Sequence, residues 1–123
     1  MSTKKDGFFI GRVKSIRFAF KGVWILVTTE HSIIAQFIIA IVMTIIGFIV
    51  GLSTIEWVLQ FLAIGLVMVA EAINTSIEKL TDYIQPQYDK KIGLIKDISA
   101  GGPAIAAIIA IIIGLIIYIP KIF

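Results

Sequence analysis

Four polar side chains share one stripe of a predicted helix: Glu71, Asn74, Glu78 and Asp82. At 100° per residue they lie within an arc of about 80°, whereas Lys79 points about 80° away from Glu71. The uncharged run FLAIGLVMVA precedes them, so the stripe begins at membrane depth, where an acid costs a few kcal/mol and usually marks a functional site. Acids near a helix C-terminus also oppose the helix dipole, so we expect a compensating cation from another helix or a bound metal ion.

Two other elements are predicted to approach this stripe from the same side of the membrane. Glu30 stands just before the first apolar segment, and Lys96 and Asp97 stand just before or within the start of the third, where a helix N-terminus favours phosphate. With no cysteine and a single histidine, carboxylates suit a hard cation such as Mg²⁺ bridged to phosphate oxygens. The set predicts phosphoryl transfer: Glu71 as general base for a lipid hydroxyl, Glu78 and Glu30 as metal ligands, and Lys96 neutralising the transferred group.

Membrane helices must position these residues. The chain has 123 residues, 59% hydrophobic and 15% charged, and its mean hydropathy is +1.02, far more apolar than an ordinary soluble domain. Three apolar segments are each long enough to cross a hydrocarbon core of about 30 Å, namely residues 33–52, 57–80 and 98–119. They predict an all-α integral membrane protein with one membrane domain over residues 1–123.

The connections between these segments differ in length. A tight turn joins the first two spans, and a cytoplasmic loop over residues 82–97, interrupted by Pro86 and Gly93, is predicted to join the last two. Residues 7–27 carry an apolar stripe at helical spacing and predict an amphipathic helix on the inner membrane surface. A helix that simply packs on the bundle is the alternative. Pro103 must lie in a first turn or kink the third span.

Basic residues are distributed unevenly about the spans. Lys121 lies on one side, and ten others lie on the side of the N-terminus and the second loop: Lys4, Lys5, Arg12, Lys14, Arg17, Lys21, Lys79, Lys90, Lys91 and Lys96. This asymmetry predicts a cytoplasmic N-terminus and a C-terminus outside. Trp24, Trp57 and Tyr118 are interpreted as aromatic anchors at the interfaces.

The motifs EAINTSIEKLTD and IKDISAG resemble the signature of the prokaryotic diacylglycerol kinase family, small three-span lipid kinases that include the undecaprenol kinases. The likeness extends to the FKG at Phe20 to Gly22, to Glu30 eight residues later, and to the spacing of 25 residues from Glu71 to Lys96. It implies an ATP- and Mg²⁺-dependent lipid kinase of the bacterial inner membrane. It also implies a homotrimer whose active sites are shared between neighbouring subunits.

The resemblance assigns roles to individual residues. Glu71 is implied as the catalytic base, and Glu30 and Glu78 as metal ligands. Nucleotide binding is implied for Arg12, Phe18, Glu30, Asn74, Glu78, Asp82, Gln87, Lys91, Lys96 and Asp97, and contact with the lipid for Trp24, Glu71 and Ser99.

Several alternatives stay open at the level of sequence. Diacylglycerol and undecaprenol both present a primary hydroxyl at the interface; the nearly neutral stretch after Glu30 and the ISAG form favour undecaprenol by resemblance. A small proton-coupled or multidrug transporter would use one membrane glutamate, but it needs that acid near the midplane. A purely structural membrane subunit is a third reading.

Overall fold

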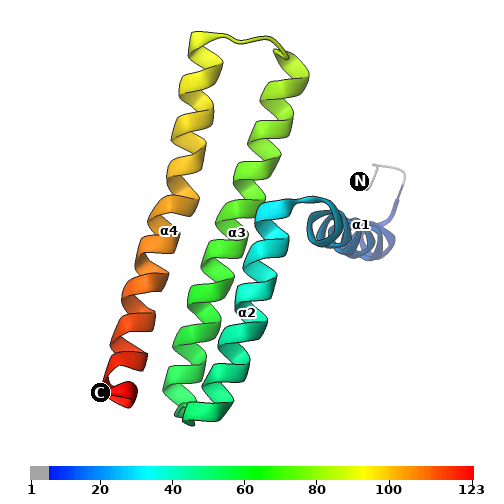
Figure 1. The fold of residues 1–123 in the computed structure, drawn as a ribbon. Coiled ribbons are helices and arrows are strands. Elements are labelled where there is room, and N and C mark those ends of the chain that lie inside the picture. The colour runs from blue at the N-terminus through cyan, green and yellow to red at the C-terminus, as the bar shows by residue number, and fades with distance from the viewer. Residues whose placement is uncertain (1–5) are drawn as a thin grey trace.

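The computed structural model describes residues 6–123, and Lys4 and Lys5 lie outside this range. The described chain forms four helices and contains no strand: α1 (Phe8–Thr29), α2 (His31–Val50), α3 (Thr54–Ile84) and α4 (Lys90–Ile122). The last three run side by side as an up-and-down bundle, while α1 projects away from it (Figure 1). By length and composition α2, α3 and α4 can each cross a membrane, as the sequence predicts.

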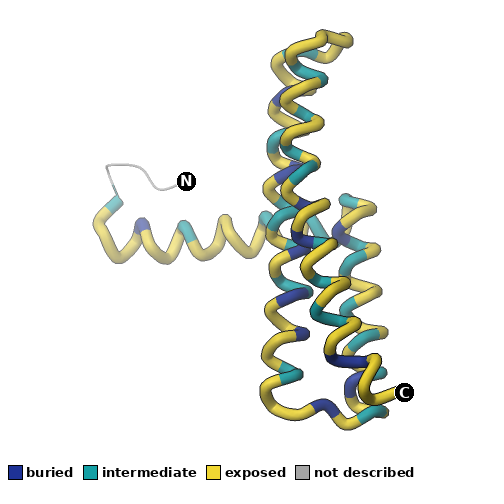
Figure 2. Tube along the Cα trace, turned by 90° about the vertical axis from the view of Figure 1, so that its left-hand side faces the viewer, coloured by how far each residue is buried: buried dark blue, intermediate teal, exposed yellow. Residues whose placement is uncertain are grey.

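Helix α1 lies across the direction of the bundle, as the view turned by 90° shows (Figure 2). Its large apolar side chains are mostly exposed, among them Phe9, Phe20 and Trp24. Glu30, which has extended backbone angles, ends α1 and begins α2, so a single residue makes the corner between them. The helix itself is confirmed, whereas its amphipathic character and its position on the membrane surface stay predictions.

The turn between α2 and α3 is built from local capping. Gly51 has a φ of +73°, the left-handed conformation that a glycine adopts without a Cβ clash, and its N–H bonds to the Gly47 carbonyl at 3.0 Å. Ser53 and Glu56 then form a capping box at the start of α3. Trp57, half-buried, packs so closely over Gly47 that an added Cβ would lie 2.7 Å from its ring. The tight antiparallel hairpin is therefore confirmed.

The connection between α3 and α4 is much shorter than the sequence suggested. Helix α3 continues to Ile84 and α4 begins at Lys90, so the predicted loop over residues 82–97 is wrong and the break covers residues 85–89. The Asp89 carboxylate accepts the N–H groups of Lys91 and Ile92, which caps α4 early. Gly93 lies inside the helix. Polar residues near an apolar span do not end a helix when its backbone hydrogen bonds continue into water.

The ends of the predicted spans shift accordingly. The first span is His31–Val50 rather than 33–52, the second Thr54–Ile84 rather than 57–80, and the third Lys90–Ile122 rather than 98–119. The N-terminal helix is Phe8–Thr29 rather than 7–27. Pro103 does not lie in a first turn: it is buried well inside α4, which continues past it.

Polar pairs join α3 and α4 near both ends, and those at the α2–α3 end also include α2. Tyr118 donates a hydrogen bond to Gln60 Oε1, and Gln60 Nε2 donates to the Met43 carbonyl of α2 at 3.1 Å. One turn closer to the α2–α3 end of the bundle, the Lys121 ammonium forms an ion pair with the Glu56 carboxylate at 3.0 Å. Gln60 and Tyr118 are both buried, so Tyr118 is more than an interfacial anchor. This outer polar cluster, Met43, Gln60 and Tyr118, ties the three spans together.

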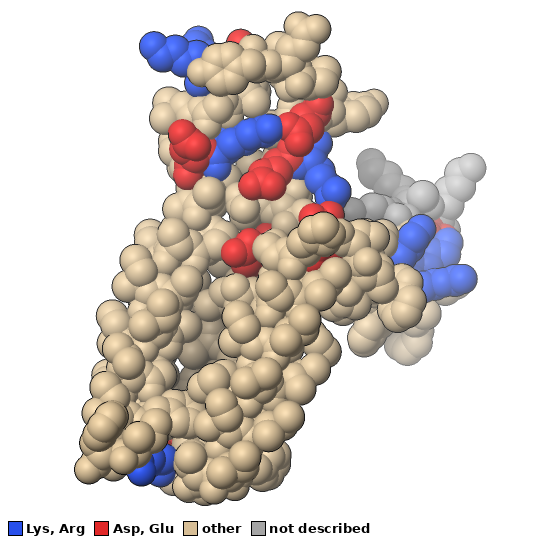
Figure 3. All heavy atoms as spheres, in the orientation of Figure 1, with Lys and Arg blue, Asp and Glu red and all other residues tan. Residues whose placement is uncertain are grey.

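Charged side chains gather at the two ends of the bundle. Most lie where α3 is followed by α4, and one acid and one base lie at the opposite end, with an uncharged surface between them (Figure 3). Between Glu56 and Glu71 on α3, and between Asp97 and Lys121 on α4, the sequence has no charged residue. The long uncharged middle is the part suited to hydrocarbon.

Candidate active site

Asn74 stands at the centre of the polar stripe and connects two helices. Its side-chain nitrogen donates to Glu78 Oε1 at 3.1 Å, and its side-chain oxygen accepts from the Ser99 hydroxyl of α4 at 2.7 Å. Asn74 is 9% exposed, so both bonds are largely shielded from solvent. The amide is thereby held in one orientation, and one oxygen of the Glu78 carboxylate is held with it.

Lys96 of α4 forms an ion pair with Asp82 of α3. A cation from another helix does therefore compensate the acidic end of α3, as its charge pattern predicts. Lys96 does not lie beside a helix N-terminus, because α4 begins at Lys90, about 9 Å earlier along the axis. The Asp82 side chain is 60% exposed, so solutes can reach the pair.

Glu71 lies one to two turns deeper than Asn74 and Glu78 on the same stripe, and it is half-buried. No residue of the described chain, 6–123, forms a hydrogen bond or an ion pair with its carboxylate. An acid at this depth without a protein partner is free to accept a hydrogen bond from a ligand. It lies on the membrane side of the Asn74 and Glu78 pair.

Glu30 is brought to a neighbouring face of α3 and not to the stripe. Its carboxylate pairs with Lys79 at 2.9 Å and is half-buried. A cavity of about 310 Å³ lies here under α1, lined by Leu26, Glu30, Ala72 and Lys79 among others. Lys79 lies off the stripe, as its position in the sequence predicts. Within one chain Lys79 pairs with Glu30, so Glu30 does not lie beside Glu78.

No cluster of three or more acidic or histidine side chains that could hold a metal occurs within residues 6–123. Glu78 and Asp82 are the exposed acids of the stripe, one helical turn apart. Mg²⁺ in phosphoryl-transfer sites is typically held by one or two carboxylates together with phosphate oxygens. A single chain therefore provides the beginning of such a site and not a closed cage.

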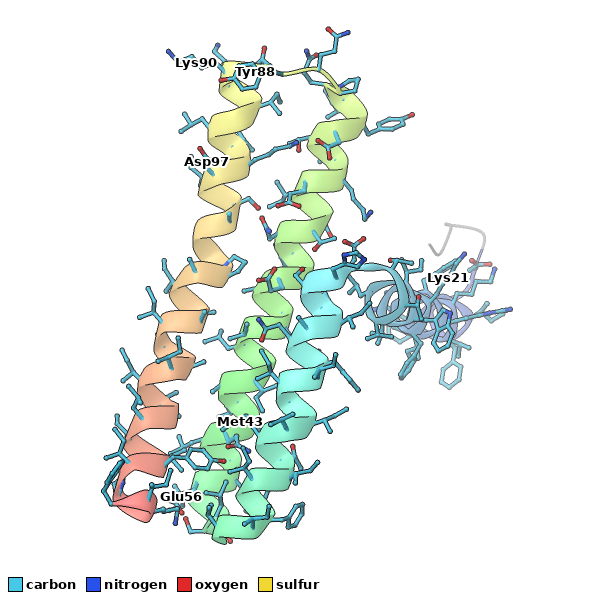
Figure 4. The ribbon with its side chains drawn as sticks, in the orientation of Figure 1. Lys21, Met43, Glu56, Tyr88, Lys90 and Asp97 are labelled. Carbon is cyan, nitrogen blue, oxygen red and sulfur yellow. The ribbon has the colours of Figure 1, made fainter. Side chains whose placement is uncertain are left out.

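The remaining predicted site residues are spread over α1 and the end of the bundle where α3 is followed by α4. The Arg12 guanidinium lies 5.7 Å from the centre of the Phe8 ring, and Phe18 shares a shallow concavity of α1 with Lys14, Arg17 and Lys21. Trp24 is exposed on α1. Gln87 lies in the short connection and Lys91 in the first turn of α4, both exposed. Asp97 points away from α3 (Figure 4).

The site is thus a polar column at one end of the α3–α4 pair. From the membrane outward it contains Glu71, the hydrogen-bonded Asn74 and Ser99, Glu78, and the Asp82–Lys96 pair. Figure 1 shows that this end of α3 and α4 extends beyond the level of α1. Glu30 and Arg12 do not contact the column within one chain. The arrangement offers a half-buried acid beside two exposed acids and a lysine.

Comparison with known proteins gives a consistent result. The family model for prokaryotic diacylglycerol kinase matches residues 17–118, which include every member of the polar column. The undecaprenol kinase of Bacillus subtilis (strain 168) is 38% identical over 108 residues, and the alignment covers 88% of each chain. Both matches extend over most of the chain. The chain belongs to the prokaryotic diacylglycerol kinase family.

Proposed function

We propose that this protein is a membrane lipid kinase that transfers the γ-phosphate of ATP to the primary hydroxyl of a lipid. Membership in the family supports a lipid kinase. The observation that carries the proposal is the polar column: Glu71, an acid with no partner within residues 6–123, lies on the membrane side of Glu78, Asp82 and Lys96. A lipid hydroxyl and a water-soluble nucleotide can approach this column from opposite sides.

Glu71 acts as the general base in this mechanism. It accepts the proton of the lipid hydroxyl as the hydroxyl oxygen forms a bond to the γ-phosphorus, while the bond from that phosphorus to the bridging oxygen breaks and ADP leaves. Its half-buried position matches an alcohol that stays in the membrane. General-base catalysis typically contributes about 10²–10⁴-fold to the rate.

Lys96 neutralises charge on the transferred phosphoryl group, and Asp82 keeps the lysine directed along the column until the nucleotide arrives. The Ser99 and Asn74 pair holds the Glu78 carboxylate in position. Further nucleotide contacts are proposed for residues around the cytoplasmic end of the bundle and on α1: Arg12, Phe18, Gln87, Lys91 and Asp97.

Mg²⁺ is the proposed metal, because oxygen ligands without cysteine suit a hard cation. Glu78 would hold it together with phosphate oxygens, and Glu30 is proposed as a second ligand. When bound, the metal reduces the negative charge on the phosphate oxygens. Since Glu30 pairs with Lys79 in one chain, it must leave this lysine or come from a neighbouring copy.

A homotrimer with shared sites would supply the missing side of the column. Its acids are open on one side, since Glu78 and Asp82 are exposed, and an arriving subunit can bring Glu30 to them. Mixed oligomers of Glu30→Gln and Glu71→Gln chains test this, because a site that takes Glu71 from one chain and Glu30 from its neighbour can then be intact, and part of the activity returns. No recovery at any mixing ratio contradicts a shared site.

The proposed acceptor is undecaprenol, and diacylglycerol is the alternative. The relative from Bacillus subtilis is named for undecaprenol, and the residues after Glu30 are nearly neutral. Vesicles containing both lipids and ATP labelled in the γ-phosphate decide between them. Label in undecaprenyl phosphate supports the proposal, whereas label confined to phosphatidic acid assigns diacylglycerol.

We propose that the protein lies in the bacterial inner membrane, with its N-terminus and the α3–α4 connection in the cytoplasm and its C-terminus outside. The excess of basic residues at that end supports this orientation. The comparisons give no support to the transporter considered above. Glu71 also follows the uncharged stretch of α3, residues 57–70, rather than lying in the middle of it, where such a mechanism needs its acid.

A further inference from the structure

A cavity of about 330 Å³ lies among the three spans, between the polar column and the outer polar cluster of Met43, Gln60 and Tyr118. Its walls are almost entirely aliphatic, with small residues of α4, Ala107, Ala110 and Gly114, on one side. The surface is hollowed between α4 and the α2–α3 pair in Figure 3. The volume is at the lower end of the range for ligand pockets.

The cavity continues the stripe of α3 that carries the catalytic acid. Val67, Ala63 and Gln60 line the cavity, and at 100° per residue all three lie within about 80° of Glu71 around the helix. Val67 is four residues, about 6 Å along the helix axis, from Glu71. A molecule whose hydroxyl is beside Glu71 therefore has the cavity directly beneath it.

The outer end of the cavity is closed by groups whose hydrogen bonds are already made. Gln60 and Met43 line it there, and both belong to the outer polar cluster with Tyr118. No buried side-chain polar atom of residues 6–123 is left without a partner. Gln36 is the one polar lining side chain without a hydrogen bond inside residues 6–123. Elsewhere along the cavity a charged or hydrated ligand would lose its water without replacement, so an apolar chain is the chemistry that fits.

We propose that this cavity binds the apolar chain of the acceptor lipid next to its hydroxyl group. The inference rests on the proposed lipid kinase function and adds a site that selects the acceptor by its chain. One hydrocarbon chain of the acceptor lipid enters between α3 and α4 and runs from Glu71 towards Gln60. The rest of the acceptor remains among the surrounding membrane lipids. A single-chain polyprenol suits a single cavity of this size.

Photocrosslinking tests the site without any need for turnover. A polyprenol carrying a diazirine on its second isoprene unit is irradiated with the full-length protein in vesicles free of ATP. The proposal predicts that the label appears in the α3 peptide with Val67 and in the α4 peptide with Ala107 and Ala110. Label confined to α1 or to the lipid-facing side of α2 overturns it, whether or not the protein proves to be a kinase.

Kinetics provide a second test with a matched control. Ala110→Leu fills the cavity, whereas Ala104→Leu makes the same change on an exposed face of α4. With undecaprenol, Ala110→Leu lowers kcat/KM at least about tenfold, chiefly through KM, and Ala104→Leu changes it less than about twofold. Prenol, a single isoprene unit that ends before the cavity, loses less than about threefold with either variant.

Equal loss of activity by Ala110→Leu with both acceptors contradicts chain binding, because it indicates a general disturbance of the bundle or a cavity filled by another copy. Unchanged kcat/KM for undecaprenol contradicts it as well. If wild-type protein transfers phosphate to neither acceptor, the kinase proposal fails, and the crosslinking pattern still decides whether the cavity binds the chain.

Discussion

The Ser99 hydroxyl of α4 donates a hydrogen bond to the side-chain oxygen of Asn74 on α3, with 2.7 Å between the two oxygens. The same amide donates to Glu78, so a shift of Ser99 on α4 changes the position of the Glu78 carboxylate on α3. The contact lies where the uncharged part of the bundle meets its charged end (Figure 3). It connects the position of α4 to the geometry of the proposed metal ligand.

Replacement of Ser99 tests this connection. In Ser99→Ala the Asn74 oxygen loses its donor, and one hydrogen bond is worth about 1 kcal/mol, or about fivefold in a rate or affinity. We expect the KM for Mg-ATP to rise by about this factor, with Ser99→Thr, which keeps the hydroxyl, restoring most of it. A Ser99→Thr variant as impaired as Ser99→Ala would show that side-chain size and not the hydroxyl is what matters.

Lys79 is expected to compete with the metal for Glu30. Because the two side chains form an ion pair at 2.9 Å, removing the lysine frees the carboxylate. Lys79→Met should therefore lower the Mg²⁺ concentration for half-maximal activity, and Glu30→Gln should raise it severalfold. Titration of activity with Mg²⁺ measures both, and identical titrations for Glu30→Gln and wild type would remove Glu30 from the metal site.

Lys96 is expected to act in the chemical step. Lys96→Met removes the positive charge that stabilises the transferred phosphoryl group, so kcat should fall by about 10²-fold or more. Lys90→Met is the matched control, since Lys90 is exposed at the first position of α4 (Figure 4) and has no proposed contact with ATP. Single-turnover rates separate chemistry from product release. Comparable rates for the two variants would contradict the assignment.

Tyr118 is expected to stabilise the fold from the far end of the bundle. Tyr118→Phe leaves the buried Gln60 oxygen without its donor, at a cost of about 1–2 kcal/mol in the free energy of unfolding. Tyr88→Phe, at a side chain that is 90% exposed, should leave that free energy unchanged. Equilibrium unfolding in mixed micelles measures both. Equal free energies of unfolding for the two variants would show that the Tyr118 hydroxyl does not stabilise the fold.

Much of the fold could be predicted because its signals are local. Apolar runs of 20 residues or more indicate spans, and the three that the sequence contains coincide with α2, α3 and α4. The ends of α3 and α4 could not be found this way, since hydropathy stops at the first charges while the hydrogen-bonded backbone continues to Ile84 and from Lys90. The Asp89 cap was the available signal: an acid followed by a helical pattern.

In the candidate site, too, the residues that share one helix could be predicted, whereas the contacts between helices could not. Glu71, Asn74, Glu78 and Asp82 lie on one helix, so periodicity alone groups them. The pairing of Asn74 with Ser99 depends on the register between two helices, and the true length of their connection sets that register. Gln60 was overlooked, although a glutamine inside an apolar run, on the same stripe as Glu71, is the kind of signal that marks a buried polar contact.

Lipid phosphorylation by Glu71→Gln in vesicles is the most direct test of the central claim, that an acid at membrane depth activates a lipid alcohol. We expect labelled lipid phosphate with wild type, at least about 10²-fold less with Glu71→Gln, and nearly full activity with Glu56→Gln in the first turn of α3, while all three proteins bind ATP equally. Glu71→Gln turnover within about threefold of wild type would contradict the claim.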